Sequence, residues 1–307
     1  MSDPGQALAT WRPLAGSVEA LRYVLLDVFT AKPMQGNQLA VFPGAQGLEG
    51  AAMQAIAAEL KLSETVFALA AEGGGDMRVR IFTPSAELPF AGHPVLGAAV
   101  VAAGALERRL VVLETGMGEV RVTVDATSGL LAQAAMDQPV PTWEPFPRAP
   151  ELLAALGLKE SGLPVEVYEN GPRHVYVEAG SRQAVAELAP DLQAVLAILG
   201  ARGVSCFAGE GTAYKTRMFA PGLGVPEDPA TGSAAGPLAV HLLRHGRLGF
   251  GEQIEIEQGA EIGRPSLLRA RVEGRGSGIE RVVVGGDAVI VGEGELLAPT
   301  GMQPPDA

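Results

Sequence analysis

The sequence predicts an α+β fold made of two similar halves, and three observations support this prediction. Segments rich in β-branched and aromatic residues outnumber segments with helical spacing, which indicates a strand-rich chain. A unit of strand, loop, glycine and apolar helix occurs twice, half a chain apart, which indicates a duplicated domain. The 307 residues, 47% of them hydrophobic, are enough for two domains of about 150 residues, each with its own core.

The repeated unit reads RIFTPSAELPFAGHPVLGAAVVAAG at residues 80–104 and RMFAPGLGVPEDPATGSAAGPLAVHLLRHG at residues 217–246. Each copy begins with a strand and reaches a glycine at which an apolar helix starts: Gly92-His93 in the first copy, Gly232-Ser233 in the second. The first N–H groups of a helix have no intrahelical acceptor, and the helix dipole favours negative charge there. We therefore expect a small anionic ligand between the halves, where two helix N-termini converge.

The second copy taken alone also fits a simpler interpretation, in which an acidic loop precedes an ordinary N-cap formed by Thr231 or Ser233. Gly232 would let the backbone approach a ligand closely, and Thr231 or Ser233 would add a hydroxyl to the N–H groups. Asp228 in the same loop would repel an anion, but its carboxyl group could accept or donate a proton during catalysis. The first copy favours the ligand site because the same junction occurs twice.

The prolines of the two helices fall at different positions. Pro94 suits the first helical position if His93 caps the helix. Pro237 lies further along the second helix and would delete an intrahelical hydrogen bond. Either that helix starts at Gly236, or its first turn is irregular around the ligand.

The first half has the patterns of several strands and two helices. The strand that follows the first helix begins with Glu64 and is otherwise apolar. A charge at a strand edge is often simply solvated; if Glu64 faces the cleft instead, desolvation would raise its pKa and suit it to proton transfer. The expected order is strand 23–29, turn 32–37, strand 38–42, helix 48–60, strand 62–69, the first repeated unit, and strands 110–114, 119–124 and 130–137.

The second half repeats this order after a proline-rich break at residues 139–145. We therefore expect halves at 18–138 and 139–299, the last strand belonging to the second half or returning to the first. Residues 1–17 and 300–307 lack periodicity and are expected to be flexible. The expected order is strand 165–168, turn 170–172, strand 174–178, helix 182–199 interrupted at Pro190, strand 204–208, the second repeated unit, and strands 254–257, 266–273, 281–285 and 288–292.

Composition excludes several classes of function. The net charge is −12, with 35 acidic and 23 basic residues and no basic cluster, which argues against nucleic acid and anionic membrane surfaces as partners. No leader pattern and no apolar run long enough to span a bilayer is present, so we expect a cytoplasmic protein. The single cysteine, Cys206, excludes an internal disulfide, and the four histidines show no zinc-ligand spacing.

Familiar catalytic motifs are absent. No glycine-rich segment has the spacing and context of a dinucleotide fingerprint, and Ser233 lacks the G-x-S-x-G elbow. His93, Asp228 and Ser233 could form a Ser-His-Asp triad on paper. The duplication makes His93 and Ser233 equivalent positions, and two helix N-termini facing one ligand explain the pair more simply.

The remaining signal is a set of motifs in a fixed order along the chain. Four of them cover both glycine–helix junctions, the turn before the second strand, and the strand that begins with Glu64. Three more lie at the break between the halves and within the second half. They are QGN at 35–37, LSET at 62–65, FAGHP at 90–94, EDPATGSA at 227–234, MDQPVPTW at 136–143, NGPRHV at 170–175 and EIGRPSL at 261–267.

Together these motifs resemble those of the phenazine-biosynthesis (PhzF-like) isomerase family, over nearly the whole chain. The last three are similar to those of the family members that act in phenazine biosynthesis itself. The resemblance implies the diaminopimelate-epimerase fold, in which each half is a curved sheet, or open barrel, around a central helix and the site lies between the halves. It also implies a homodimer that needs no metal or organic cofactor.

The resemblance assigns site residues to this sequence. It implies Glu64, His93 and Asp228 as catalytic residues, and an anionic substrate bound by the six residues given below. Epimerases of this fold use one cysteine at each helix start, and here those positions hold no cysteine, so a two-cysteine racemase mechanism is excluded. The predicted binding residues, which include those of the two helix starts, are Asn37, Ser63, Gly92, Thr231, Gly232 and Ser233.

The implied activity is the isomerisation of trans-2,3-dihydro-3-hydroxyanthranilate, with Glu64 carrying a proton from C3 to C1. Two alternatives stay open: a family isomerase or epimerase acting on another small amino or keto acid, and a non-catalytic protein that binds a small acid. Glu64, Glu227 and Asp228 would place three negative charges beside an anionic ligand. Such crowding is tolerable only if one group in the site is cationic or one carboxyl is protonated. His93 is a candidate for the cation and Glu64 for the protonated group.

Overall fold

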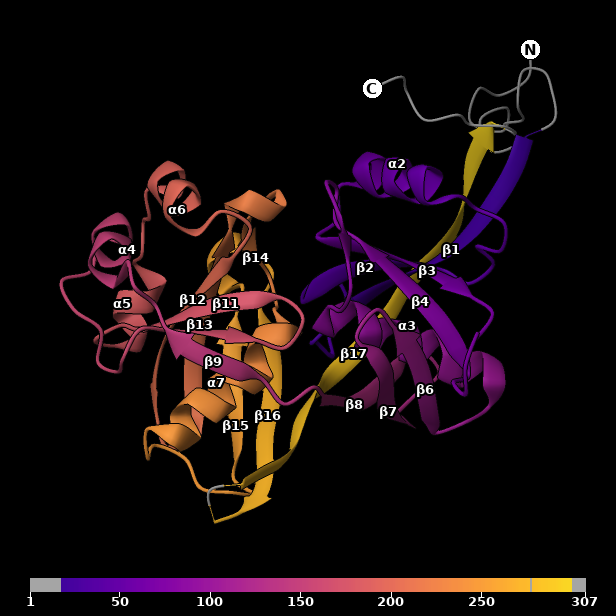
Figure 1. Ribbon diagram of the computed structural model, residues 1–307. Coiled ribbons are helices and arrows are strands. Elements are labelled where there is room, and N and C mark those ends of the chain that lie inside the picture. Colours follow the sequence, from indigo (N-terminus) through magenta and orange to yellow (C-terminus); the bar gives the residue numbers. More distant parts are fainter. Residues whose placement is uncertain (1–17, 277, 300–307) are drawn as a thin grey trace.

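Strands dominate the molecule, as the sequence predicts. The structure is a computed structural model that describes residues 18–276 and 278–299; the segments 1–17 and 300–307, expected to be flexible, lie outside the described residues. The described strands form one continuous sheet of 17 strands that folds into two lobes (Figure 1). The predicted mixed α+β class is confirmed.

The first lobe wraps strands around a single long helix, α3 (Gly92–Leu106), whose residues are small and apolar. This helix contacts strands on all sides, so it is buried around most of its circumference (Figure 1). Alanine and glycine on α3 let the surrounding strands approach it closely. The other elements are β1 (Val18–Val28), β2 (Asn37–Phe42), α2 (Gly50–Leu60), β3 (Glu64–Leu69), β4 (Met77–Phe82), β5 (Glu87–Leu88), β6 (Leu110–Thr115), β7 (Gly118–Ala126) and β8 (Leu131–Gln138).

The second lobe is built in the same way around α7 (Gly232–Arg244), whose residues from Gly232 to Leu242 are all buried. Short helices cover its outer face (Figure 1). Its other elements are β9 (Thr142–Pro145), α4 (Ala149–Ala155), β10 (Glu166–Glu169), β11 (Arg173–Glu178), α5 (Arg182–Ala186), α6 (Leu192–Leu199), β12 (Gly203–Glu210), β13 (Ala213–Ala220), η1 (Pro221–Leu223), β14 (Val225–Asp228), β15 (Gln253–Gln258), η2 (Ala260–Ile262) and β16 (Ser266–Arg275).

A single strand, β17 (Gly278–Pro299), runs through both lobes (Figure 1). Its first part pairs with β16, its middle with β8 and its last part with β1, always antiparallel. Two separate strands were expected over 281–292; β17 is continuous because Gly285, Gly286 and Asp287 stay paired with β8.

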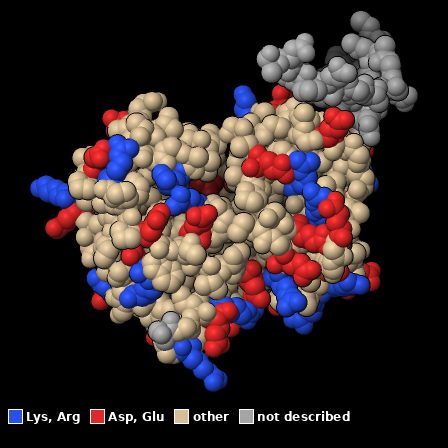
Figure 2. Space-filling model, viewed as in Figure 1, with Lys and Arg blue, Asp and Glu red and all other residues tan. Residues whose placement is uncertain are grey.

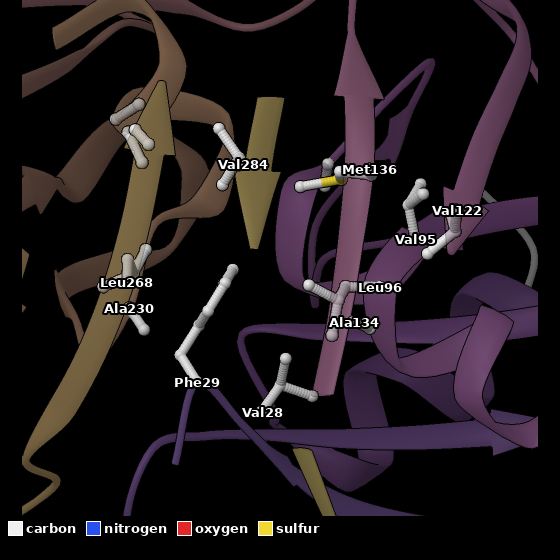
Figure 3. Close-up of a cluster of buried hydrophobic side chains, with 14 of the residues drawn as sticks. Val28, Phe29, Val95, Leu96, Val122, Ala134, Met136, Ala230, Leu268 and Val284 are labelled. Atoms are coloured by element: carbon white, nitrogen blue, oxygen red, sulfur yellow. The ribbon is translucent and has the colours of Figure 1, made fainter. Parts of the chain in front are cut away.

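The core is continuous across the junction of the lobes. Phe29, fully buried at the end of β1, lies between Ala230 and Leu268 on one side and Leu96 on the other (Figure 3). Each fully buried side chain of this size stabilises the fold by roughly 1.5–3 kcal/mol relative to exposure. The two lobes are therefore joined by apolar packing as well as by β17.

The structure corrects several predicted elements. Helix α4 was not predicted, and the proline-rich break contains strand β9, which pairs with β10 at an edge where prolines are tolerated. Strand β14 forms inside the expected loop, because its residues pair with β13. The helix expected over 182–199 is interrupted at Pro190, as predicted, and forms α5 and α6.

The surface agrees with the charge balance of the sequence. On the face shown in Figure 2, acidic and basic side chains are interspersed, with no continuous basic area among the residues the structure describes. Within 18–276 and 278–299, no helix is both long and apolar enough to cross a membrane.

Candidate active site

The N-termini of α3 and α7 meet at their glycines. A Cβ added to Gly92 would lie 2.4 Å from the carbonyl carbon of Gly232 and 2.4 Å from the backbone nitrogen of Ser233. A Cβ added to Gly232 would lie 2.9 Å from the ring of Phe29. Neither position can hold a side chain, so the two glycines allow the helix starts to touch. The first-turn N–H groups of both helices are thereby brought to one place, although Pro94 in α3 supplies none.

The first helix starts differently from the prediction. Ala91, with extended backbone angles, is the N-cap of α3, and the helix begins at Gly92. His93 is therefore inside the first turn rather than a cap, and Pro94 is the third helical residue, where its missing N–H is still harmless. The imidazole of His93 is thus free to face the site.

The first turn of α7 is held by side chains of β8, of β11 and of the turn between β10 and β11. Pro237 lacks the N–H that would donate to the carbonyl of Ser233, and the Asn170 amide donates to that carbonyl instead, at 3.0 Å. The Gln138 amide donates to the carbonyl of Gly232 at 2.8 Å, and the Tyr176 hydroxyl donates to that of Ala234 at 2.8 Å. The helix therefore begins at Gly232 with an irregular first turn, which decides between the two expected alternatives.

Glu64 faces the interior rather than solvent. Its side chain is only 14% exposed, and its Oε2 lies 3.5 Å from Nε2 of His93 without forming a hydrogen bond. Burial, and secondarily the negative charge of Asp228, raises the pKa of Glu64 well above its ordinary value. The expectation of a merely solvated strand-edge charge is wrong, and burial favours the protonated form of the carboxyl.

His93 is neutral. Burial lowers the pKa of its imidazole to about 3, opposed by a hydrogen bond with the backbone of Gln38. The Asn37 amide nitrogen lies 3.2 Å from Nδ1 of His93. Of the two ways to relieve charge crowding, the structure thus favours a protonated Glu64 over a cationic His93.

Asp228 is fixed by residues from both lobes. Its Oδ1 accepts from the Asn37 amide at 2.8 Å, and its Oδ2 accepts from the Thr231 hydroxyl at 2.6 Å. Burial raises the pKa of Asp228 to about 6, although hydrogen bonds from Thr231, Asn37 and Ser63 oppose this. The Thr231 hydroxyl thus already donates its hydrogen to Asp228. The backbone N–H of Thr231 donates to the side-chain oxygen of Gln258. Asn37 joins the lobes by also donating to the carbonyl of Ala230 at 3.0 Å.

Four of the predicted site residues line one cavity between the lobes, with a volume of about 40 Å³, enough for a few water molecules. Such a narrow space keeps bulk water from the carboxyl groups. A substituted six-membered ring is larger, so ligand entry requires the walls to separate. The lining includes Glu64, Asp228, Thr231 and Ser233, and it adds Thr83, Leu88, Ala91, Pro172, His174, Met218, Ala220, Leu223 and Val225.

The strand registers show which positions of the two lobes are equivalent and that the lobes differ at them. In the first lobe Glu64 is paired with Leu39, and Thr65 with Phe82; in the second, Gly203 is paired with His174, and Val204 with Phe219. Gly203 is therefore the counterpart of Glu64.

The other carboxylate also lacks a counterpart. Ile81 pairs with Leu88 as Met218 pairs with Asp228, so Leu88 is the counterpart of Asp228. Each lobe supplies one carboxylate, from a different structural position. An enzyme with two equivalent bases would need matching groups at matching positions, and this site does not have them.

All nine predicted site residues lie at or beside this junction, whereas four contributors were not singled out from the sequence. Asn170 and His174 lie in the NGPRHV motif, and their equivalence to the segment around Asn37 was the available signal. Gln138 and Gln258 act through hydrogen bonds from distant strands. No local pattern marks them.

A possible metal-ligand set lies elsewhere, at the far end of α7. Donor atoms of Glu166, His241 and His245 all lie within 4.8 Å of one another. Arg244 donates to Oε2 of Glu166 at 2.6 Å, and its guanidinium lies 4.2 Å from the ring centre of Trp143. The Arg244 guanidinium therefore already supplies the positive charge that the Glu166 carboxylate would otherwise take from a metal ion.

Comparisons with known proteins agree with the geometry. The family model described as "Phenazine biosynthesis-like protein" matches residues 26–294. A trans-2,3-dihydro-3-hydroxyanthranilate isomerase from Pseudomonas aeruginosa is 50% identical over 273 residues, covering 89% of this chain and 98% of the relative.

Solved structures place the fold. A predicted epimerase from Pseudomonas aeruginosa has a TM-score of 0.78 at 34% identity, covering 91% of this chain and 100% of the other. A hydroxyproline epimerase from Agrobacterium vitis has a TM-score of 0.62 at 14% identity, covering 92% of this chain and 93% of the other, which shows the epimerase-like fold alone. The chain therefore belongs to the phenazine biosynthesis-like (PhzF) protein family.

Proposed function

We propose that this protein is a trans-2,3-dihydro-3-hydroxyanthranilate isomerase of phenazine biosynthesis and that Glu64 transfers the proton. The name is that of its relative from Pseudomonas aeruginosa, which it matches over 98% of the relative's length. The observation that carries the mechanism is the buried Glu64 carboxyl in a narrow cavity, beside two helix N-termini.

The substrate's own chemistry defines the task. Two double bonds, C4=C5 and C6=C1, connect C3 to the carbon that bears the carboxylate, so negative charge left at C3 spreads to C1. The C3–H bond breaks, both double bonds shift by one position, and a C1–H bond forms. The product is an enol at C3, which becomes a ketone. One acid–base group suffices if it reaches C3 and C1 on the same ring face.

Glu64 is suited to this single-group transfer. The asymmetry of the lobes supports it, because the position equivalent to Glu64 is Gly203 and offers no second base. The raised pKa makes the protonated carboxyl a stable state after it removes the C3 proton. Exclusion of water lets it return that proton to C1 before exchange.

Binding places the substrate's charges against the groups described above. We assign the substrate carboxylate to the N–H groups at Gly92, Gly232 and Ser233, each charged hydrogen bond contributing roughly 1.5–3 kcal/mol. Asp228 accepts from the substrate's ammonium group. That positive charge also favours ionisation of the adjacent Glu64, which makes it a base when substrate is bound. Neutral His93 orients the ring and stabilises charge on the dienol.

The test is direct conversion. Purified protein with the substrate should show loss of the diene's ultraviolet absorbance, and Glu64→Gln should reduce turnover at least about 100-fold, the lower range for a general acid–base group. Glu59→Gln, an exposed change on α2, is the matched control. Turnover retained by Glu64→Gln would refute the assignment.

The same assay separates the alternatives. Conversion of another small amino or keto acid, but not of dihydrohydroxyanthranilate, would indicate a family isomerase of different specificity. Binding without conversion of either would indicate a small-acid binding protein. The family resemblance further supports a cytoplasmic homodimer with halves at 18–138 and 139–299, the last strand returning to the first half. Sedimentation tests the dimer, and limited proteolysis tests the halves.

A further inference from the structure

His174 takes no part in the proton transfer proposed above, yet it lies in the same cavity. It belongs to β11, is 3% exposed, and its Nε2 lies 3.2 Å from the hydroxyl oxygen of Ser233. No other group in the described part of the chain forms a hydrogen bond with that hydroxyl. The direction of the Ser233 hydroxyl therefore depends on which nitrogen of His174 carries the proton.

The surroundings of the imidazole determine its protonation. Burial lowers the pKa of His174 to about 4, so the ring is neutral near pH 7 and has a single N–H. Nδ1 is buried without a hydrogen-bond partner among the described residues. It faces the backbone of Gly203, where an added Cβ would lie 3.0 Å away. A buried N–H without an acceptor is rarer than a buried acceptor without a donor, so the proton belongs on Nε2.

We propose that His174 is a positioning residue that donates Nε2–H to the Ser233 oxygen and thereby directs the serine hydroxyl hydrogen into the cavity, toward a substrate carboxylate. This proposal rests on the proposed function for the identity of the carboxylate. Gly203 contributes by leaving room for the ring, which ties the loss of a second base to the gain of an oriented hydroxyl.

The duplication supports an acquired role. The counterpart of His174 in the first lobe is Leu39, a fully buried apolar residue. At that position a strand facing a central helix is expected to carry an apolar side chain, as β2 does. A buried histidine there, bonded to the second residue of α7, departs from the apolar pattern where β11 meets the cavity.

A double-mutant cycle tests the kinetic part. His174→Leu should raise KM about tenfold, the equivalent of one weakened charged hydrogen bond, while kcat changes less. In a Ser233→Ala background the same change should have little further effect, because its target is gone. His174→Gln, whose amide nitrogen can replace Nε2 as donor, should restore most of the loss. Equal effects of His174→Leu in both backgrounds would overturn the proposal.

Tyr176→Phe is the matched control, since it removes a hydrogen bond from β11 to α7 without touching the Ser233 hydroxyl. Its effect should be the same with and without Ser233. Thermal unfolding of each variant reports whether it folds.

A spectroscopic measurement decides the tautomer independently of activity. In protein with ¹⁵N-labelled histidine, the imidazole signals that disappear in His174→Gln should show the Nε2–H form at pH 7. The Nδ1–H form would overturn the proposal. If the wild-type protein does not convert dihydrohydroxyanthranilate, the proposed function fails, whereas this measurement and calorimetric binding of anthranilate to the same variants still test His174.

Discussion

Substituting alanine for Gly92 tests whether contact between the two helix starts creates the site. Gly92 has no left-handed φ, so alanine is compatible with its backbone, and space is the only obstacle. The new Cβ would lie 2.4 Å from two backbone atoms of Gly232 and Ser233, where an ordinary contact is 3.4 Å or more. The helix starts must therefore separate by about 1 Å, because backbone atoms cannot rotate away.

A displacement of this size has a large expected effect on rate. A misplacement of about 1 Å can cost about 100-fold, and we expect kcat/KM of Gly92→Ala to fall by that factor. Forced separation should also destabilise the protein by about 1–3 kcal/mol, a typical cost of overpacking. Initial-rate assays and urea unfolding measure the two effects.

The matched control is Gly104→Ala, on the same helix and of the same chemistry. A Cβ there meets nothing within 4 Å. Alanine inside a helix is more favourable than glycine by roughly 0.5–1 kcal/mol, so this variant should be slightly more stable and fully active. If Gly92→Ala kept kcat/KM within threefold of the wild-type value, or if Gly104→Ala lost as much, the close-contact explanation would be wrong.

Three further predictions concern the titrating groups. The folded pKa of Glu64 is raised well above its ordinary 4.5, so the stability from this group is present below pH 4.5 and is lost as pH rises toward the folded pKa. Glu64→Gln should therefore gain stability relative to wild type in urea unfolding as pH rises above 4.5, until the folded pKa is passed, and a constant difference would contradict this. Asp228→Asn removes the nearby charge that raises the pKa of Glu64, so it should move the acid limb of the pH profile of kcat/KM to lower pH. It should also raise KM more than it lowers kcat. Abolished turnover with intact binding would instead make Asp228 a proton-transfer group and require a mechanism with two bases. His93→Ala should lower kcat more than it weakens binding of anthranilate, and the reverse pattern in kinetics and calorimetry would assign His93 to binding.

The position of the site could be predicted because its main signals are local. The unit of strand, loop, glycine and apolar helix can be recognised within about 25 residues of sequence, and its repetition indicates two lobes. The family motifs then mark Glu64, His93 and Asp228, and the structure brings these three together. Apolar patterning likewise predicts most strands, since alternation follows directly from the backbone period of two.

The direction in which the site side chains face and their protonation states could not be predicted, because both depend on contacts between distant segments. Burial between the lobes, and secondarily the charge of Asp228 in the second lobe, raises the pKa of Glu64. Asn37 bonds to Asp228 across 191 positions of sequence, and no local propensity encodes such a contact.

The sequence by itself determined the class of fold, the duplication, the two glycine–helix junctions and the family. Only the tertiary structure decided that the helix starts touch, that His93 is neutral, and that Asn170 replaces the hydrogen bond lost at Pro237. It also showed Gly203 at the position equivalent to Glu64 and His174 beside Ser233. The physical reason is that helices and strands follow from local periodicity, whereas desolvation, close backbone contact and proton position depend on groups that only folding brings within a few ångströms.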